Sequence, residues 1–327
     1  MTRKIFSQPA APGRKGLFCV CAAVLLHAAF TVRATEDLAS LATNFAPLGR
    51  LIVTQFVTAP FPHPARAAGH KYHDLFFSAV EHYSDSTVAM FIPKNFRAAG
   101  KIDFVVHFHG WSNTVAGTLT QFKLVEQLCA SGKNAILIVP EGPRNALDSF
   151  GGKLEDTNGF KAFMAEAVEI LCASGIGRPA GLPYRWGGAA APPEIGSIIL
   201  SGHSGGYHVM AAIVDHGGLS EKIREVWLFD ALYGGTEKFV AWQKSENGRL
   251  LDIYTDHGGT KEETENLMAA YRTNGVSFFA AEDTNAPPES LRTNRLVFLH
   301  TDLAHNDVVA KRGTFEQFLK TSCLGTK

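Results

Sequence analysis

Residues Ile198–Gly206 have the sequence Ile-Ile-Leu-Ser-Gly-His-Ser-Gly-Gly, an apolar run that ends in the pattern Gly-x-Ser-x-Gly. The run has the composition of a buried strand, and the next segment, Tyr207–Val214, has that of a helix. Where a strand turns sharply into a helix, flanking residues approach too closely for side chains, and the serine is left exposed on the turn. The stretch therefore predicts a nucleophile, Ser204, at the end of a strand.

The rest of the chain alternates short apolar runs with helix-period segments, which is typical of parallel strands joined by crossover helices. We expect strands at Thr87–Ile92, Ile102–Phe108, Ala135–Val139, Ser197–Leu200, Val226–Phe229, Leu250–Tyr254 and Leu296–Leu299. We expect helices at Leu119–Ala130, Gly159–Ala173, Gly206–Asp215, Glu237–Lys244, Lys261–Arg272 and Thr314–Lys320. This order predicts an α/β protein, a three-layer sandwich with helices on both faces of a mostly parallel sheet. Ligands bind beyond the carboxyl ends of such strands.

A serine hydroxyl needs a base to act as a nucleophile. The sequence offers His305, in the loop Thr301–Asp307 between the last predicted strand and the last predicted helix. An imidazole in that loop can reach over the edge of the sheet. The nearby His300 fits better as part of the strand itself, so we expect His305 to be the base.

Two carboxylates are candidates for the acid that orients this base, and each follows a strand. Asp230 ends Val226–Asp230, and Asp256 ends Ile253–Asp256. A carboxylate set against so apolar a strand as the first is costly to bury unless it is paired, and a histidine N–H is a suitable partner. We therefore favour Asp230 and keep Asp256 as the alternative. Either choice keeps the chain order Ser, Asp, His.

Acyl transfer also needs donors for the oxyanion. We expect one from the backbone N–H of Gly205, the residue after the nucleophile. The second is expected from Gly110 and Trp111, where the apolar run Phe104–Trp111 ends in His-Gly and opens a loop. The same run contains a His-x-His pair that is also compatible with a metal site, but no further ligands follow at matching spacing, and we predict no metal.

The substrate pocket has weaker signals. The polar, glycine-rich loop Pro140–Gly152 leaves the same predicted sheet edge as the nucleophile, and its Arg144 is a candidate substrate-binding residue. An ion pair of Arg144 within this loop is the alternative. His109 and His203, which flank the oxyanion loop and the nucleophile, are expected to contribute to substrate binding. Thr260, after Gly258-Gly259, is expected to cap the next helix.

These residues give the chain a resemblance to the α/β-hydrolase superfamily. Residues 202–206 match its nucleophile elbow, residues 108–111 match its oxyanion loop, and the order Ser, Asp, His is that of the superfamily. The match covers roughly residues 85–320. In that superfamily the acid more often stands where Asp256 does, while some lipase-like members place it as Asp230 would be. The resemblance implies serine catalysis, but it does not fix the substrate, because the superfamily contains esterases, lipases, amidases and peptidases.

Composition and charge narrow the class of protein. The chain has 327 residues, 46% of them hydrophobic, and equal numbers of basic and acidic side chains, 31 each. Residues 1–34 carry five basic side chains and no acidic one, which leaves the rest at 26 basic against 31 acidic. This mildly acidic body lacks the basic face that nucleic acids require.

The N-terminus has the pattern of a signal peptide: basic residues, an apolar run at Leu17–Phe30, and small residues at Val32–Ala34. The apolar run is shorter than the roughly 20 residues of a membrane-spanning helix. We therefore expect removal of residues 1–34 and a single catalytic domain over residues 35–327, secreted or periplasmic, with no membrane span.

The sequence as a whole predicts a serine hydrolase without a cofactor, acting on a small-molecule, peptide or polymer substrate. An ester is the leading bond, and a peptidase or cell-wall amidase is the alternative enzyme. A binding protein with an incomplete set of catalytic groups is the alternative outside the enzymes.

Overall fold

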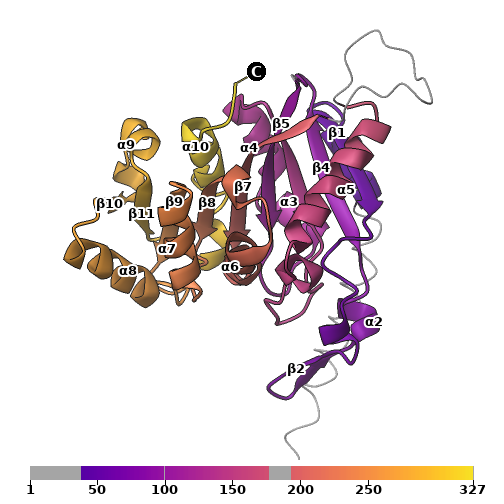
Figure 1. Ribbon diagram of the computed structural model, residues 1–327, viewed down its shortest axis with the longest axis horizontal. Coiled ribbons are helices and arrows are strands. Elements are labelled where there is room, and N and C mark those ends of the chain that lie inside the picture. Colours follow the sequence, from indigo (N-terminus) through magenta and orange to yellow (C-terminus); the bar gives the residue numbers. More distant parts are fainter. Residues whose placement is uncertain (1–37, 99, 177–192, 327) are drawn as a thin grey trace, which may run out of the picture.

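The computed structural model describes residues 38–98, 100–176 and 193–326. Its centre is a nine-stranded sheet with the order β1-β4-β6-β5-β7-β8-β9-β11-β10 (Figure 1). The strands are β1 (Gly49–Gln55), β4 (Thr87–Pro93), β5 (Lys101–Phe108), β6 (Ala135–Pro140), β7 (Glu194–His203), β8 (Ile223–Phe229), β9 (Arg249–Thr255), β10 (Phe279–Glu282) and β11 (Leu296–Thr301). β4 runs antiparallel to both of its neighbours, β1 and β6. All other neighbouring strands of the sheet are parallel to each other. The predicted α/β class and mostly parallel sheet are confirmed.

Each of the seven expected strands is present, and five of the six expected helices agree closely. The longer helices are α3 (Val115–Gln121), α4 (Leu124–Ser131), α5 (Gly159–Ala173), α6 (Tyr207–His216), α7 (Thr236–Ser245), α8 (Lys261–Thr273) and α10 (Thr314–Thr321), with the short α9 (Pro288–Thr293) before β11. The single helix expected over Leu119–Ala130 is wrong. The chain breaks there at Lys123, whose φ of 48° is left-handed, and the break packs Phe122 into the core.

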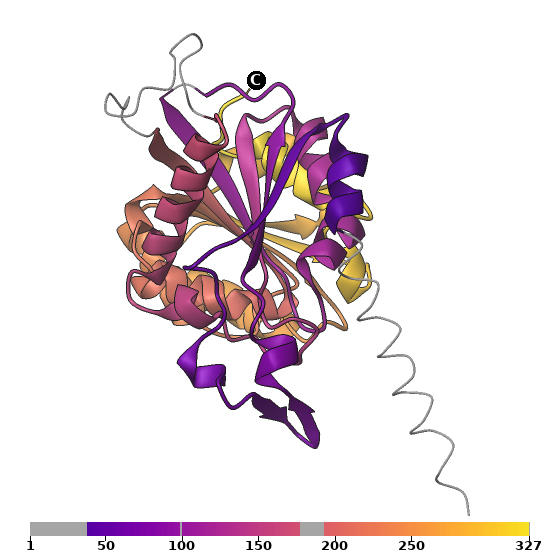
Figure 2. The same ribbon diagram turned by 90° about the vertical axis from the view of Figure 1, so that its right-hand side faces the viewer.

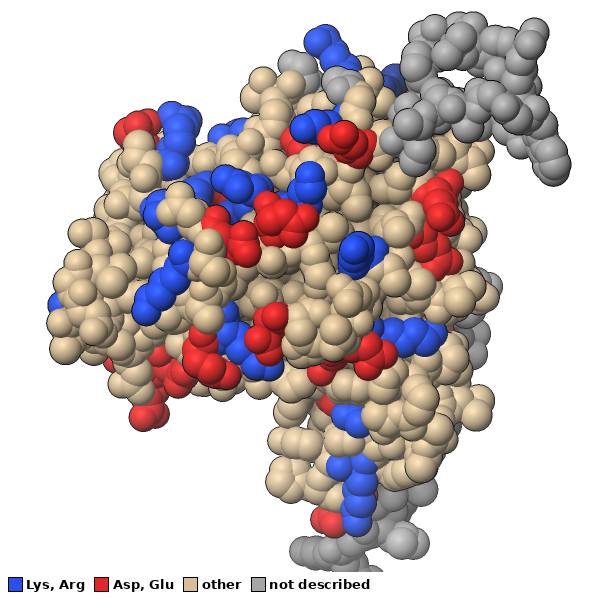
Figure 3. All heavy atoms as spheres, viewed as in Figure 1, with Lys and Arg blue, Asp and Glu red and all other residues tan. Residues whose placement is uncertain are grey.

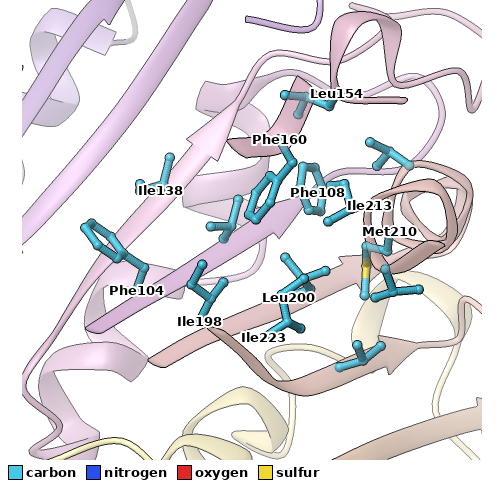
Figure 4. Close-up of a cluster of buried hydrophobic side chains, with 14 of the residues drawn as sticks. Phe104, Phe108, Ile138, Leu154, Phe160, Ile198, Leu200, Met210, Ile213 and Ile223 are labelled. Carbon is cyan, nitrogen blue, oxygen red and sulfur yellow. The ribbon is translucent and has the colours of Figure 1, made fainter. Parts of the chain in front are cut away.

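The sheet divides the core into two layers because neighbouring residues of a strand face opposite sides. Phe104 and Phe108 of β5 and Leu200 of β7 pack with α5 and α6 on one face (Figure 4). Val105 follows Phe104 in β5, and Ile199 precedes Leu200 in β7. Both therefore pack on the other face of the sheet, where α3, α4 and α10 lie. Burial of both faces explains why these strands are apolar nearly throughout.

Residues 56–86, between β1 and β4, form an insertion whose structure the sequence left open. It contains the 3₁₀ turn Pro64–Arg66, the hairpin of β2 (His70–Tyr72) and β3 (Leu75–Phe77), and the one-turn helix α2 (Ala79–His82). Both views show the hairpin projecting away from the central sheet (Figures 1 and 2).

The insertion is anchored to the loop after β6 by one carboxylate. Asp148, which is nearly buried, accepts hydrogen bonds from Arg66 Nε at 2.6 Å and from the Tyr83 hydroxyl at 3.1 Å. The Arg66 guanidinium also lies over the ring of Phe150, 4.6 Å from its centroid. These contacts hold the base of the hairpin against a loop at the carboxyl edge of the sheet.

The surface carries no single-sign patch on the face shown in Figure 3, where basic and acidic side chains are interspersed. Within the described residues, no helix has the length and hydropathy needed to span a membrane. The predicted signal peptide, residues 1–34, lies outside the described residues.

Candidate active site

Ser204 stands at a tight turn between β7 and α6. Its φ of 53° is left-handed, which is strained for a residue other than glycine and is often found at functional sites. The turn needs its glycines: a Cβ on Gly202 would lie 2.4 Å from Met210 Sδ, and one on Gly206 would lie 2.7 Å from the Phe108 carbonyl oxygen. The local geometry is therefore that of the predicted elbow, with the serine at its apex.

His305 and Asp230 lie together at the same edge of the sheet. His305 Nδ1 is 2.6 Å from Asp230 Oδ2. Asp230 directly follows β8 and is fully buried, and its carboxylate also accepts hydrogen bonds from the hydroxyls of Thr255 and Thr260. Burial alone would raise the pKa of Asp230, but the hydrogen bonds from His305, Thr260 and Thr255 outweigh it and lower the pKa. The carboxylate is thus held charged against the imidazole.

Asp256, the alternative acid, has other partners. It is exposed, and its Oδ1 lies 2.7 Å from Lys261 Nζ and 3.1 Å from His300 Nε2. His300 belongs to β11, as expected from the sequence, and its Nδ1 faces Glu282. Lys261 and His300 lower the pKa of Asp256 through these hydrogen bonds. Of the two candidates, Asp230 contacts His305, whereas Asp256 joins a separate surface network.

The expected oxyanion loop lies against the elbow. A Cβ on Gly110 would be 2.6 Å from Ser204 Cβ and 3.2 Å from the Gly205 backbone nitrogen, so the glycine permits a close approach. A Cβ on Gly205 would in turn be 2.8 Å from Cδ1 of Trp111. Residues Gly110, Trp111, Ser204 and Gly205 therefore form one compact group.

His109 orients this loop from below and is nearly buried. Its Nε2 accepts the N–H of Gly142 at 2.9 Å, so Nδ1 carries the proton and donates it to the Gly110 carbonyl at 2.8 Å. The Glu141 carboxylate is a more distant neighbour of Nε2, at 3.3 Å. In a planar trans peptide the N–H points opposite to the C=O. Fixing the Gly110 carbonyl therefore also fixes the direction of the Trp111 N–H.

His203 has a comparable position under the loop that carries His305. Its Nε2 lies 2.9 Å from the His305 carbonyl oxygen, and the two rings are 4.5 Å apart. Burial, and then the neighbouring imidazole of His305, lower the pKa of His203 to about 3. The ring is therefore neutral at pH 7, and its Nε2–H donates to the carbonyl.

A cavity of about 420 Å³ opens beside Ser204 and His305. Its other lining residues are Trp111, Ser112, Asn113, Gln121, His203, Tyr233 and Asn306. Arg144 is not among them, and its Nη1 instead pairs with Asp85 of the insertion at 3.0 Å. Across the described ranges, no group of three or more His, Cys, Asp or Glu side chains is arranged to hold a metal ion.

The elbow serine follows β7, Asp230 follows β8 and His305 follows β11, so all three reach one edge of a sheet covered by helices on both faces. A strand-turn-helix serine with partners in the order Ser, Asp, His is the defining arrangement of one superfamily. The chain has an α/β-hydrolase fold. Within it, the loop after β5 that contains Gly110 lies beside Ser204.

Solved structures with this fold include several similar to the chain. A mutant feruloyl esterase module from Clostridium thermocellum, complexed with sinapinate, has a TM-score of 0.49 and 10% identity over 84% of this chain and 88% of that one. An S-formylglutathione hydrolase from Staphylococcus aureus has a TM-score of 0.44 and 8% identity, over 82% and 97%. An enterobactin and salmochelin hydrolase has a TM-score of 0.43 and 13% identity, over 86% and 98%. No protein-family profile and no curated protein matches the chain.

Sequence reasoning missed three polar partners of the site in this α/β-hydrolase fold. Thr255 and Thr260 both donate hydrogen bonds to Asp230. Thr260 is the N-cap residue of α8, as expected, but its hydroxyl bonds Asp230 instead of an N–H of the helix. The Tyr233 hydroxyl donates to the Gly258 carbonyl, and Tyr233 lines the cavity beside Ser204. Burial, and then Asp230, raise the pKa of Tyr233 to about 12. Tyr233 follows β8, Thr255 ends β9 and Thr260 follows β9, and these positions were the available signal.

Proposed function

We propose that the protein is a serine hydrolase that cleaves carboxylic esters, with Ser204 as nucleophile, His305 as general base and Asp230 as the acid that orients His305. The main support for the proposal is the 2.6 Å contact between Asp230 and His305. His305 and Ser204 line the same cavity. A hydrogen bond at Nδ1 leaves the other ring nitrogen, Nε2, available for a serine hydroxyl.

In the first half of the reaction, Ser204 Oγ attacks the ester carbonyl and His305 Nε2 takes the serine proton. The negative oxygen of the tetrahedral intermediate is stabilised by the N–H groups of Gly205 and Trp111. His305 then gives the proton to the leaving alcohol, and an acyl group remains on Ser204. In the second half, water takes the part of the serine, and the acid is released.

Asp230 acts through His305. Its charge stabilises the imidazolium that forms after proton transfer, and its hydrogen bond holds the ring in one tautomer. The hydrogen bonds from Thr255 and Thr260 support this role because they keep the carboxylate charged while it is buried. The proposed chemistry uses no cofactor and no metal.

The test is hydrolysis of p-nitrophenyl acetate and butyrate, with a p-nitroanilide amide beside them, by the wild type and Ser204→Ala. We expect hydrolysis of both esters and a loss of kcat on the order of 10⁴-fold or more in the variant. Circular dichroism of both proteins controls for folding. Equal rates in wild type and variant would contradict the proposal, and faster cleavage of the amide would favour the peptidase or amidase.

We further propose that residues 1–34 are a signal peptide, so that the enzyme acts outside the cytoplasm. The support is the basic, apolar and small-residue pattern of the N-terminus. The intact mass of the protein recovered from an exporting host tests this. A chain that begins at Thr35 is expected, and a full-length chain in the exported fraction would contradict it.

A further inference from the structure

The cavity beside Ser204 has a hydrogen-bonding wall without ionic groups. Besides His203, Ser204 and His305, the polar side chains of this wall include those of Ser112, Asn113, Gln121 and Asn306. None of the described lining residues is Lys, Arg, Asp or Glu. Each amide offers two N–H donors and a carbonyl acceptor, and a serine hydroxyl both donates and accepts. This wall therefore suits a neutral ligand group that also donates and accepts hydrogen bonds.

Two of these amides are adjacent to each other. The side-chain oxygen of Asn113, Oδ1, accepts the backbone N–H of Thr114 at 2.8 Å. The side-chain nitrogen of Asn113 lies 3.5 Å from Gln121 Oε1. Gln121 is the last residue of α3, and its side chain is exposed to the cavity. We call Asn113, Gln121 and Asn306 the amide wall.

Aromatic surface completes the cavity. Trp111 and Tyr233, which both line it, are 40% and 38% exposed, unusually open for such large side chains. Trp111 is nevertheless fixed: its Nε1 donates to Ser149 Oγ at 2.7 Å, and Tyr72 of the β2–β3 hairpin packs edge-on against its ring at 5.0 Å. A fixed, partly exposed ring is a preformed platform for an apolar face of a ligand.

We infer that this cavity receives a sugar, and that the substrate is a neutral O-acylated saccharide. The inference rests on the proposed ester hydrolysis. A sugar ring presents C–H groups on its faces and hydroxyls around its rim, so one group can contact both the aromatic platform and the amide wall. A charged alcohol or acid would lose hydration in this cavity without gaining an opposite charge.

Hydrolysis of an acylated saccharide needs water as its only other reactant. The acyl carbon forms a bond to Ser204 Oγ as its bond to the saccharide oxygen breaks, and that oxygen takes the proton held by His305. Water then cleaves the acyl-serine. One ester and one water give one saccharide hydroxyl and one carboxylic acid.

The experiment compares four butyrate esters by pH-stat: methyl 6-O-butyryl-glucopyranoside, 2-methoxyethyl butyrate, butyrylcholine and O-butyryl-lactate. The methoxyethyl ester has an ether-substituted leaving alcohol but no hydroxyls, and the last two carry a positive and a negative charge. We expect kcat/KM for the sugar ester to exceed that of each of the others by about tenfold or more, the value of one or two additional hydrogen bonds.

Gln121→Leu removes one amide from the wall at an exposed position. We expect this variant to lower the sugar-to-methoxyethyl ratio of kcat/KM about fivefold or more, mainly through a higher KM for the sugar ester. Gln317→Leu is the matched control, because Gln317 is an exposed residue of α10 whose amide bonds the Arg312 carbonyl. It should leave both substrates unchanged.

The outcomes separate this inference from the proposed function. If Ser204-dependent hydrolysis is present but the methoxyethyl or a charged ester is cleaved as well as the sugar ester, the inference is overturned and the serine hydrolase stands. If Gln121→Leu leaves the ratio unchanged, the amide wall does not bind the sugar and the inference is also overturned. If no ester is cleaved in a Ser204-dependent manner, the proposed function itself fails.

Discussion

Asp230 and His305 are 75 residues apart in the chain, yet Oδ2 of one lies 2.6 Å from Nδ1 of the other. The contact depends on a glycine, because a Cβ on Gly258 would lie 1.6 Å from Asp230 Oδ2. It also depends on a left-handed backbone at Asp230, with φ of 46°. Two unfavourable features, a buried carboxylate and a strained backbone, thus occur at one residue, which is typical of a functional site.

The first prediction separates the two candidate acids. Asp230→Asn removes the charge that faces His305 and lets the ring settle in the wrong tautomer, so kcat for p-nitrophenyl butyrate should fall about 10⁴-fold. Asp256→Asn is the matched control, and its kcat should stay within about threefold of wild type, because Asp256 pairs with Lys261 and His300. A larger loss in Asp256→Asn than in Asp230→Asn would reverse the assignment.

The second prediction concerns His203, which we interpret as a positioning residue for the loop of His305. His203→Phe keeps the ring but loses the donor to the His305 carbonyl, so kcat should fall by about tenfold with little change in KM. His203→Gln can still donate to that carbonyl and should retain more activity than the phenylalanine variant. Stopped-flow or steady-state rates with p-nitrophenyl butyrate measure both, and equal kcat values in the two variants would argue against a role for the hydrogen bond.

The third prediction concerns Tyr233, whose hydroxyl donates to the Gly258 carbonyl. Tyr233→Phe keeps the ring and removes only this bond. Gly258 lies against Asp230, so loss of the bond that holds Gly258 in place should lower kcat/KM about fivefold, with the far-UV spectrum and the melting temperature nearly unchanged. A variant as active as wild type would show that the hydroxyl does not contribute to the reaction.

The fourth prediction is a loss of stability in acid. Burial lowers the pKa of His203 to about 3, and it lowers that of His107 as well. The unfolded chain protonates these histidines near the usual pKa of about 6.5, whereas the folded chain does not. The contribution of these histidines to the free energy of unfolding should therefore be fully present above about pH 6.5, and it should be lost as the pH falls from about 6.5 to 3.

Urea unfolding of wild type and His203→Gln at pH 7.5 and 4.5 measures this effect. The variant should lose less stability between the two pH values than wild type does. His73→Gln, at an exposed position of the hairpin, is the control for removal of a histidine and should lose as much as wild type. An equal loss in His203→Gln and wild type would show that His203 does not resist protonation in the fold.

Local signals made most of the fold predictable. The strands buried on both faces are continuous apolar runs, and the serine turn combines such a run with glycines at fixed spacing. The edge strands were missed because their signals are weak: β1 has only one buried residue, Leu51, and β10 is only four residues long with no buried residue. The break at Lys123 was missed because tertiary packing of Phe122, rather than a local stop signal, divides the helix.

The site was predictable only in part, because its contacts join distant segments. Asp230 and Asp256 each follow one of two adjacent parallel strands, so the sequence pattern alone could not separate them. The fold distinguishes their surroundings. Asp230 lies against Gly258 and accepts hydrogen bonds from Thr255 and Thr260, whereas Asp256 pairs with Lys261. The insertion at residues 56–86 carries few periodic apolar residues, and its contact with Trp111 through Tyr72 could not be foreseen.

The central claim is that Ser204 is a nucleophile activated by His305 and Asp230. The most direct test is the intact mass of the folded protein after reaction with a fluorophosphonate, with Ser204→Ala and Asp230→Asn treated in parallel. We expect one adduct on the wild type, none on Ser204→Ala, and much slower labelling of Asp230→Asn. An unlabelled but folded wild type, or an adduct that persists in Ser204→Ala, would contradict it.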